Sequence, residues 1–148
     1  MYLGGMTGQK EQEYRTFSIF RDLFPDFPKG KIIQNESPDF LIKLNRRTSI
    51  GIELTELRGQ NFYDQQGHYA NPENIKSQIE NTIRAKEEKI YLYQKHKTSE
   101  LWLLIHIDSF ENKINFDLKN KIDRWNFEAE FSRVFLLEIH QKKLFQII

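Results

Sequence analysis

Phenylalanines recur at spacings of three and four near the start of the chain, at Phe17, Phe20 and Phe24. This period places them on one face of a helix, and Glu13 lies on the same face. Thr7 is a suitable capping residue, and Pro25 blocks continuation of the helix. The pattern therefore predicts a helix that begins just after Thr7 and packs an aromatic face against the rest of the protein.

Three short segments of β-strand character follow, at residues 30–36, 39–44 and 49–57. In the third, Ile50, Ile52 and Leu54 alternate with other residues, which is the period of a strand with one buried face. A short polar turn separates the second segment from the third. The spacing predicts that these two strands form an antiparallel hairpin.

A long helix is predicted over residues 72–97, because Asn71-Pro72-Glu73 combines a capping side chain, a first-turn proline and a first-turn acid. The aperiodic residues 58–71 before it are expected to form a loop. The remaining predicted elements are a buried strand at 101–108, a helical stretch at 115–131, and strands at 134–139 and 144–148. A helix between the hairpin and a buried strand makes a crossover to a parallel neighbour. The expected fold class is α/β, with a central mixed β-sheet flanked by helices.

The chain has 148 residues, a length typical of one domain, so residues 1–148 are expected to form a single domain. The absence of cysteine excludes thiolate metal sites and a cysteine nucleophile, and it suits a cytoplasmic location. The longest apolar run, Leu101–Ile105, is too short to span a membrane. With 22 Lys and Arg against 21 Asp and Glu, any basic surface must be local.

Two acids are the chemically informative residues. Asp39 opens the second predicted strand, and Glu53 in the third points away from the face of Ile50, Ile52 and Leu54. Because one hairpin strand starts where the next ends, the two carboxylates are expected to lie close together. Neighbouring carboxylates repel each other, and Mg²⁺ accepts such oxygen ligands. The alternative is an ordinary turn aspartate and a solvated strand glutamate.

Pro38-Asp39 followed by Gly51-Ile52-Glu53-Leu54-Thr55 resembles the PD-(D/E)xK nuclease superfamily. The resemblance includes the order helix, three strands, helix, strand, and it covers roughly residues 7–108. It implies a restriction-endonuclease-like αβββαβ core that hydrolyses phosphodiester bonds of nucleic acid, with DNA expected. It also implies that Asp39, Glu53 and the backbone carbonyl of Leu54 bind Mg²⁺, with Mn²⁺ as a substitute. A homodimer would be one way to engage two strands.

The sequence departs from the family at Thr55, which stands where the family has a lysine and cannot supply a cation. Lys86 is a candidate replacement, because it interrupts the apolar stripe that contains Ile79 and Ile83 on the predicted long helix. Its ammonium either extends to solvent or meets Asp39 and Glu53. A position within roughly 4–6 Å of both acids would favour an enzyme. Otherwise the expected function is a catalytically inactive module that binds nucleic acid or a protein partner.

Four weaker features accompany this set. The resemblance implies that Glu13 lies near the metal, although acids are also favoured near helix starts. Glu36 is a candidate ligand for a second metal or a plain strand-end residue. Gln78 either flanks the site or is an ordinary surface residue. His106 and Asp108 share a strand face and could be metal ligands, but no third histidine stands at a ligand spacing, so a hydrogen-bonded structural pair is expected.

Overall fold

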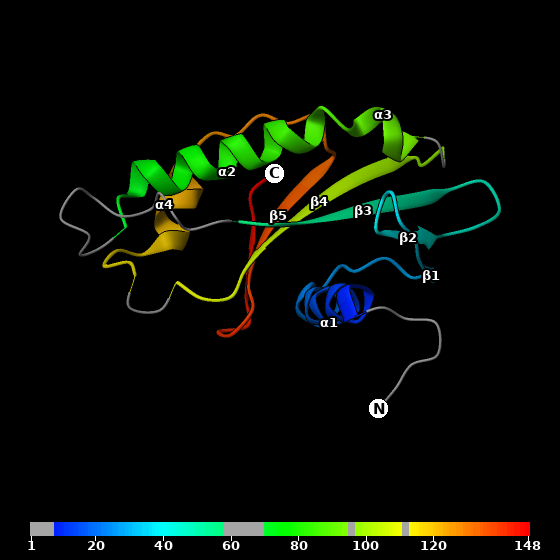
Figure 1. The fold of residues 1–148 in the computed structure, drawn as a ribbon, viewed down its shortest axis with the longest axis horizontal. Helices are drawn as coiled ribbons and strands as arrows, with labels where there is room; N and C mark the ends of the chain where they lie inside the picture. Colours follow the sequence, from blue (N-terminus) through cyan, green and yellow to red (C-terminus); the bar gives the residue numbers. More distant parts are fainter. Residues whose placement is uncertain (1–7, 58–69, 95–96, 111–112) are drawn as a thin grey trace.

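The computed structural model describes residues 8–57, 70–94, 97–110 and 113–148 (Figure 1). Its centre is one six-stranded sheet in the order β1-β2-β3-β4-β5-β6. The strands are β1 (Lys31–Gln34), β2 (Phe40–Lys43), β3 (Ser49–Glu56), β4 (Glu100–Ile107), β5 (Arg133–Glu138) and β6 (Lys143–Gln146). The pairs β3–β4 and β4–β5 are parallel, and the outer pairs are antiparallel. The predicted mixed central sheet and the antiparallel β2–β3 hairpin are therefore confirmed.

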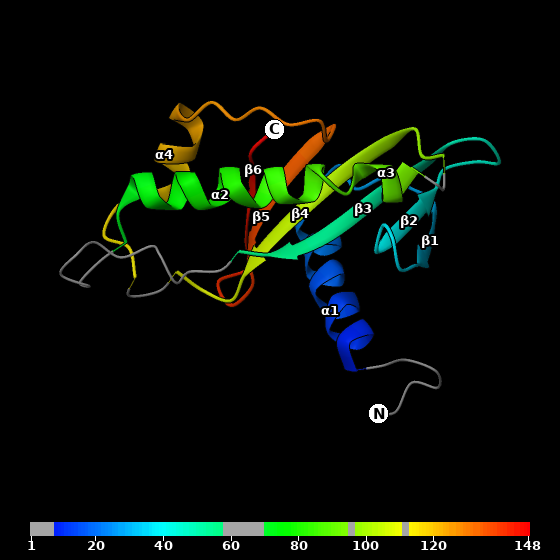
Figure 2. The same cartoon turned by 45° about the horizontal axis from the view of Figure 1, so that its top comes forward.

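Helices cover both faces of this sheet. Helix α1 (Gly8–Leu23) lies on one face, while α2 (Pro72–Glu87) and α3 (Ile90–Tyr93) lie on the other (Figure 1). Helix α4 (Leu118–Arg124) is beside α2, as Figure 2 shows. None of the helices in the described ranges is long and apolar enough to cross a membrane.

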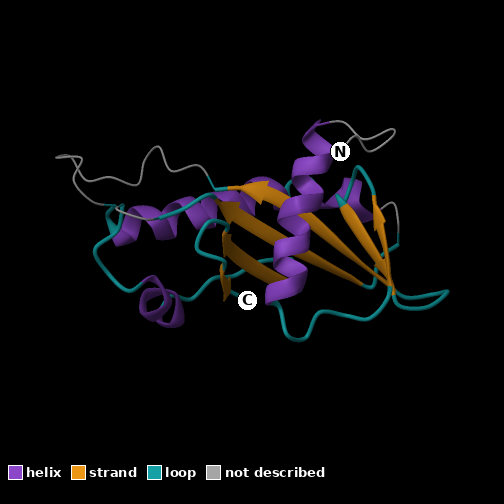
Figure 3. Ribbon diagram, turned by 90° about the horizontal axis from the view of Figure 1, so that it is seen from below, coloured by secondary structure: helices purple, strands orange, loops and turns teal. Residues whose placement is uncertain are grey.

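The core under α1 is aromatic, as the phenylalanine spacing predicts. Phe17 stacks on Phe40 of β2, with ring centroids 4.0 Å apart. Phe20 and Phe24 both pack against Phe135 of β5. These contacts fix α1 across the sheet, which Figure 3 shows from the α1 side. Thr7, the predicted cap, lies outside the described residues.

The core under α2 is mainly aliphatic, and it contains Ile75, Ile79 and Ile83. The Asn71 side chain accepts a hydrogen bond from the Glu73 amide at 2.9 Å, as a capping residue does. The expectation of one helix over residues 72–97 is wrong, because α2 ends at Glu87. The Lys89 amide then bonds to the Lys86 carbonyl in a tighter turn before α3 begins.

The other predicted elements differ in extent. Residues 115–131 contain one short helix, α4, which Asp117 caps by accepting from the Lys119 and Asn120 amides. The strands predicted at 101–108, 134–139 and 144–148 correspond to β4, β5 and β6 within a few residues. Most of the loop predicted at 58–71 lies outside the described residues, which resume at Ala70.

Candidate active site

A cleft of about 400 Å³ opens where β3 ends, with α1 on one side and the last turn of α2 on the other. In the part of the chain that the structure describes, its lining combines acids, amides, hydroxyls, an imidazole and a lysine. The residues that line it are Gln9, Gln12, Glu13, Thr16, Asp39, Glu53, Leu54, Thr55, Glu56, Lys86 and His106. The cleft therefore brings together most of the residues that the sequence singles out.

Asp39 and Glu53 meet through the hairpin register. Phe40 pairs with Ile52, which places the preceding Asp39 beside Glu53. The Asp39 amide donates to Glu53 Oε1 at 3.2 Å, and the Leu54 amide donates to Asp39 Oδ2 at 2.8 Å. The charge of Glu53 so close to Asp39 favours the protonated form of Asp39. The expected convergence of the two acids is what the structure has.

The close approach of Pro38 to Gly51 holds the chain just before Asp39. A Cβ atom added at Gly51 would lie 2.8 Å from Pro38 Cγ and 2.8 Å from Leu101 Cδ2. Only a residue without a side chain leaves this space. Gly51 thus allows Pro38 to pack across β3, and this packing sets the position of Asp39.

Gly51→Ala should lower the free energy of unfolding by about 1–3 kcal/mol, the usual cost of overpacking a buried site. Urea unfolding measures this change. Gly8→Ala is the matched control, because no atom lies within 4 Å of a Cβ at that position. Equal unfolding midpoints for the two variants would contradict the role given to the Pro38 contact.

Glu53 is buried and receives two further donors from the face of the sheet that α2 and α3 cover. Lys86 Nζ lies 3.0 Å from Glu53 Oε2, and the Tyr93 hydroxyl donates to the same oxygen at 3.0 Å. The Glu53 side chain is 8% exposed and that of Lys86 is 20% exposed. Within the described residues Lys86 pairs with Glu53 and forms no ion pair with Asp39. The ammonium therefore lies in the site, in contact with one of the two acids.

Tyr93→Phe should destabilise the protein by about 1–3 kcal/mol, because a hydrogen bond to a buried charged group is lost. Tyr91→Phe is the control, since Tyr91 is 67% exposed on the same short helix. Urea unfolding of both variants without divalent metal makes the comparison. If Tyr93→Phe unfolds at the wild-type midpoint, its hydroxyl does not support Glu53.

The cleft raises the pKa of two of its acids, Asp39 and Glu13. Burial, with the charge of Glu53 second, raises the pKa of Asp39 from 3.8 to about 8. Burial also raises the pKa of Glu13, although its hydrogen bond with Gln9 opposes this change. Without a cation beside it, Asp39 therefore stays protonated at neutral pH while Lys86 and Tyr93 hold Glu53.

The donor set fits a hard divalent cation. Asp39 and Glu53 offer carboxylate oxygens, and Leu54 lines the same cleft. In the parts of the chain that the structure describes, no three His, Asp or Glu side chains form a ready metal cage. Mg²⁺ commonly uses one or two carboxylates and completes its shell with water and substrate oxygens. This incomplete set of protein ligands is compatible with such a cation.

The weaker candidates divide between the cleft and its surroundings. Glu13 and Thr55 line the cleft. Gln78 lies in an adjoining groove that also includes Thr55 and Glu56. Glu36 is exposed and does not line the cleft.

His106 lines the cleft as well, and its expected hydrogen bond with Asp108 does not form within the described residues. Burial lowers the pKa of His106, while the charges of Glu56 and Asp108 oppose this effect. The imidazole is thus neutral at neutral pH and is accessible from the cleft.

Sequence reasoning missed the Tyr93 hydroxyl on Glu53, the polar residues of α1 beside Glu13, and Glu56, which also lines the cleft. Tyr93 was recognisable only as part of an apolar stripe, although a buried tyrosine hydroxyl needs a partner. Helix α1 contributes Gln9, Gln12 and Thr16 beside Glu13. Their spacings of three and four mark a polar stripe, and this signal was available in the sequence.

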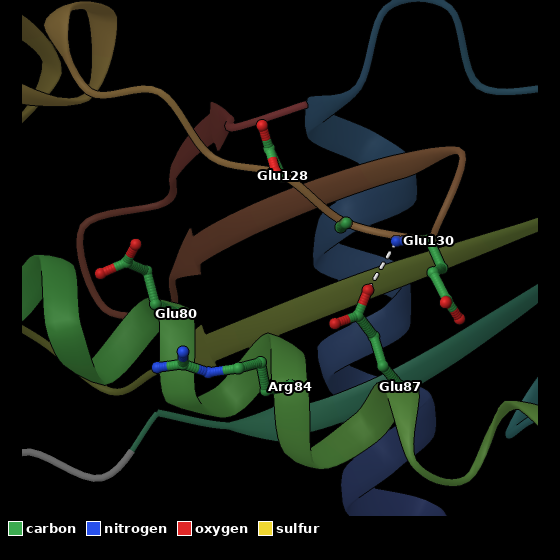
Figure 4. A pocket seen from close by; sticks show the side chains of 6 residues that line it. Glu80, Arg84, Glu87, Glu128 and Glu130 are labelled. Carbon is green, nitrogen blue, oxygen red and sulfur yellow. Dashed lines mark hydrogen bonds between the residues drawn. The ribbon is translucent and has the colours of Figure 1, made fainter.

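A second hollow lies on the other side of α2 and contains none of the predicted site residues (Figure 4). It is lined by Glu80, Arg84, Glu87, Glu128, Ala129 and Glu130. Glu87 Oε2 accepts a hydrogen bond from the Glu130 amide at 2.6 Å. This bond ties the segment before β5 to α2, which gives Glu87 a structural role.

Comparisons with protein-family models, curated proteins and solved structures found no match to this chain. Functional inference therefore depends on the geometry of the cleft and on the sequence motif that forms it.

Proposed function

We propose that this protein is a Mg²⁺-dependent nuclease that hydrolyses phosphodiester bonds, with DNA as the expected substrate. The observation that carries the proposal is the Asp39–Glu53 pair with the Lys86 ammonium on Glu53. The order α1, β1, β2, β3, α2, β4 supports the resemblance to restriction-endonuclease-like proteins. The antiparallel hairpin followed by a parallel crossover supports it as well.

Each residue then has a defined task. Asp39, Glu53 and the Leu54 carbonyl would hold Mg²⁺ or Mn²⁺. A bound cation supplies electrostatic stabilisation of the phosphoryl oxygens and lowers the pKa of an attacking water. Lys86 pairs with the Glu53 carboxylate at 3.0 Å and presents N–H donors that can orient water in the cleft. Glu13 faces the same space from α1 and can accept a hydrogen bond from that water.

In this proposal, Lys86 supplies the cation that the family motif carries at the position of Thr55. The family lysine would extend from β3, whereas Lys86 comes from the last turn of α2 and still meets Glu53 at 3.0 Å. An ammonium beside the acids is what the chemistry needs, whichever element carries it. The site thus retains a cation although the motif position has none.

The decisive experiment compares wild type with Asp39→Ala on single- and double-stranded DNA and RNA, in Mg²⁺, Mn²⁺ or EDTA. Cleavage should require the metal and fall by a factor on the order of 10² or more in Asp39→Ala. Glu36→Ala is the matched control, because this acid is exposed outside the cleft. Cleavage that survives Asp39→Ala at the wild-type rate would contradict the proposal.

The second candidate is a non-catalytic module of the same fold that binds nucleic acid or a protein. Thr55 at the motif position is the observation that favours it. Binding without cleavage of any of the four nucleic acids would select this alternative. A homodimer and a cytoplasmic location stay predictions under either function, and size-exclusion chromatography with light scattering tests the first.

A further inference from the structure

Positive charge is concentrated in two segments around β1 and β2. Residues 27–35 and 40–52 contain no acid and carry five cations, Lys29, Lys31, Lys43, Arg46 and Arg47. This leaves 17 of the 22 lysines and arginines for the rest of the chain, against all 21 acids. A nearly neutral protein therefore has a local basic region and an otherwise acidic remainder.

The fold brings four of these cations to one end of the β1–β2–β3 unit. Lys31 and Lys43 are direct cross-strand partners. The turn that follows carries Arg46 and Arg47, and it is fixed by Asn45 Oδ1, which accepts from the Arg47 and Thr48 amides at 2.9 Å. All four side chains are exposed. We call Lys31, Lys43, Arg46 and Arg47 the hairpin basic cluster.

This arrangement costs stability, because like charges directly opposite each other in a sheet repel. No ion pair within the described residues neutralises a member of the cluster. Edge strands often carry lysine against aggregation, which would account for Lys31 on the edge strand β1. It does not account for Lys43 on the inner strand β2 or for two arginines in the turn.

The cluster and the cleft are linked by strand geometry. Lys43 lies four residues after Asp39, so both belong to the same side of the sheet. Lys31 has the same orientation, because it is the register partner of Lys43. At about 3.3 Å per residue, Lys43 is about 13 Å along the chain from Asp39. A nucleic-acid strand can span this distance with a few nucleotides.

The cleft alone is poorly suited to hold a polyanion. Among the described residues, its lining contains the acids Glu13, Asp39, Glu53 and Glu56 and one lysine or arginine, Lys86. Substrate affinity therefore needs positive charge from outside the cleft, close enough for one molecule to reach both. The hairpin basic cluster meets both conditions.

We propose that the hairpin basic cluster binds the sugar–phosphate backbone of a nucleic acid and so holds the strand that enters the cleft. The inference rests on the proposed function for its placement of the substrate. Its recognition chemistry is charge pairing with phosphates, for which arginine offers two parallel donors. Duplex and single-stranded nucleic acid share this chemistry.

The test measures binding of fluorescently labelled duplex DNA, single-stranded DNA and single-stranded RNA by anisotropy, in EDTA so that metal-dependent cleavage does not interfere. The cluster variant is Lys31→Gln/Lys43→Gln/Arg46→Gln/Arg47→Gln. The matched control, Lys89→Gln/Lys119→Gln/Arg124→Gln/Lys143→Gln, removes four exposed cations elsewhere and leaves the same net charge. Urea unfolding verifies that both variants fold.

The cluster variant should bind at least about tenfold more weakly, and its log–log salt dependence should be shallower by about three to four. The control should lose much less affinity and keep the wild-type salt slope. The nucleic acid with the largest loss is the one that the cluster holds. Equal affinities for the cluster variant and the control would overturn the inference, and so would a cluster variant that only aggregates more readily.

The two proposals fail separately. Asp39→Ala should abolish cleavage yet keep cluster-dependent binding in EDTA, which would support both. If the protein binds nucleic acid through the cluster but cleaves none, the result would support the proposed role of the cluster and contradict the nuclease activity. Metal-dependent cleavage with the same kcat/KM in wild type and the cluster variant would support the nuclease activity and contradict the proposed role of the hairpin basic cluster.

Discussion

Replacing Lys86 with methionine should lower the rate of Mg²⁺-dependent cleavage by a factor on the order of 10² or more, the usual scale for a lost acid–base or electrostatic group. Methionine keeps much of the apolar stem of Lys86 and removes the ammonium from Glu53 Oε2. Lys89→Met is the matched control, because Lys89 is exposed three residues later. Cleavage rates of the three proteins under saturating metal make the measurement.

Lys86→Met should also reduce stability in EDTA, by about 3 kcal/mol, because removing one partner of a buried ion pair leaves the other uncompensated. Mg²⁺ should recover part of this loss by binding the acids of the native state. The double change Thr55→Lys/Lys86→Met should restore some cleavage, since residue 55 lies two positions after Glu53 on the same strand face. If Lys86→Met cleaves as fast as wild type, the ammonium has no catalytic role.

The second large effect is a pH dependence of stability that belongs to Asp39. Its pKa is about 8 in the folded protein, against an ordinary value of 3.8. The folded state thus holds a proton that the unfolded state releases, so this stabilisation is complete below pH about 4 and is lost as the pH rises to about 8. In EDTA, stability attributable to Asp39 should therefore decrease across this window.

Asp39→Asn isolates this effect, because asparagine cannot titrate. Urea midpoints across the window should fall more steeply in wild type than in Asp39→Asn, and the difference between the two curves belongs to Asp39. Glu13→Gln should also reduce the loss of stability with rising pH, but by less than Asp39→Asn does. The reason is that the pKa of Glu13 is also raised. Mg²⁺ should flatten the wild-type curve by competing with the proton. Parallel stability curves for wild type and Asp39→Asn would show that Asp39 does not titrate differently in the folded and unfolded states, which would contradict the prediction.

The fold was largely predictable because its elements have strong local signals. The phenylalanine spacing predicted α1, and the alternation at Ile50, Ile52 and Leu54 predicted β3. The break between α2 and α3 was not predictable from the apolar period. Ile83, Ile90 and Tyr93 all face the core, so the buried stripe continues across the break. Buried positions alone do not distinguish one helix from two that pack on the same sheet.

The site was predictable where it depends on local geometry. A hairpin fixes the relative positions of Asp39 and Glu53, and a helical period fixes the face of Lys86. The Tyr93 hydroxyl was not identified because a tyrosine in an apolar stripe has many ways to satisfy its polar end. Glu36 shows the converse, since only Ser37 separates it from the Pro38-Asp39 pair, yet its side chain is exposed outside the cleft.

The donors on Glu53 also order the events of folding. Asp39 is 14 residues from Glu53 in sequence, whereas Lys86 and Tyr93 are 33 and 40 residues away. The hairpin closes a short loop and can pair early, but burying its two acids is unfavourable until the ammonium and the hydroxyl arrive. Both arrive with the crossover helices. We therefore expect α2 and α3 to dock on the sheet in the same step that completes the site, and the two acids to face solvent until then.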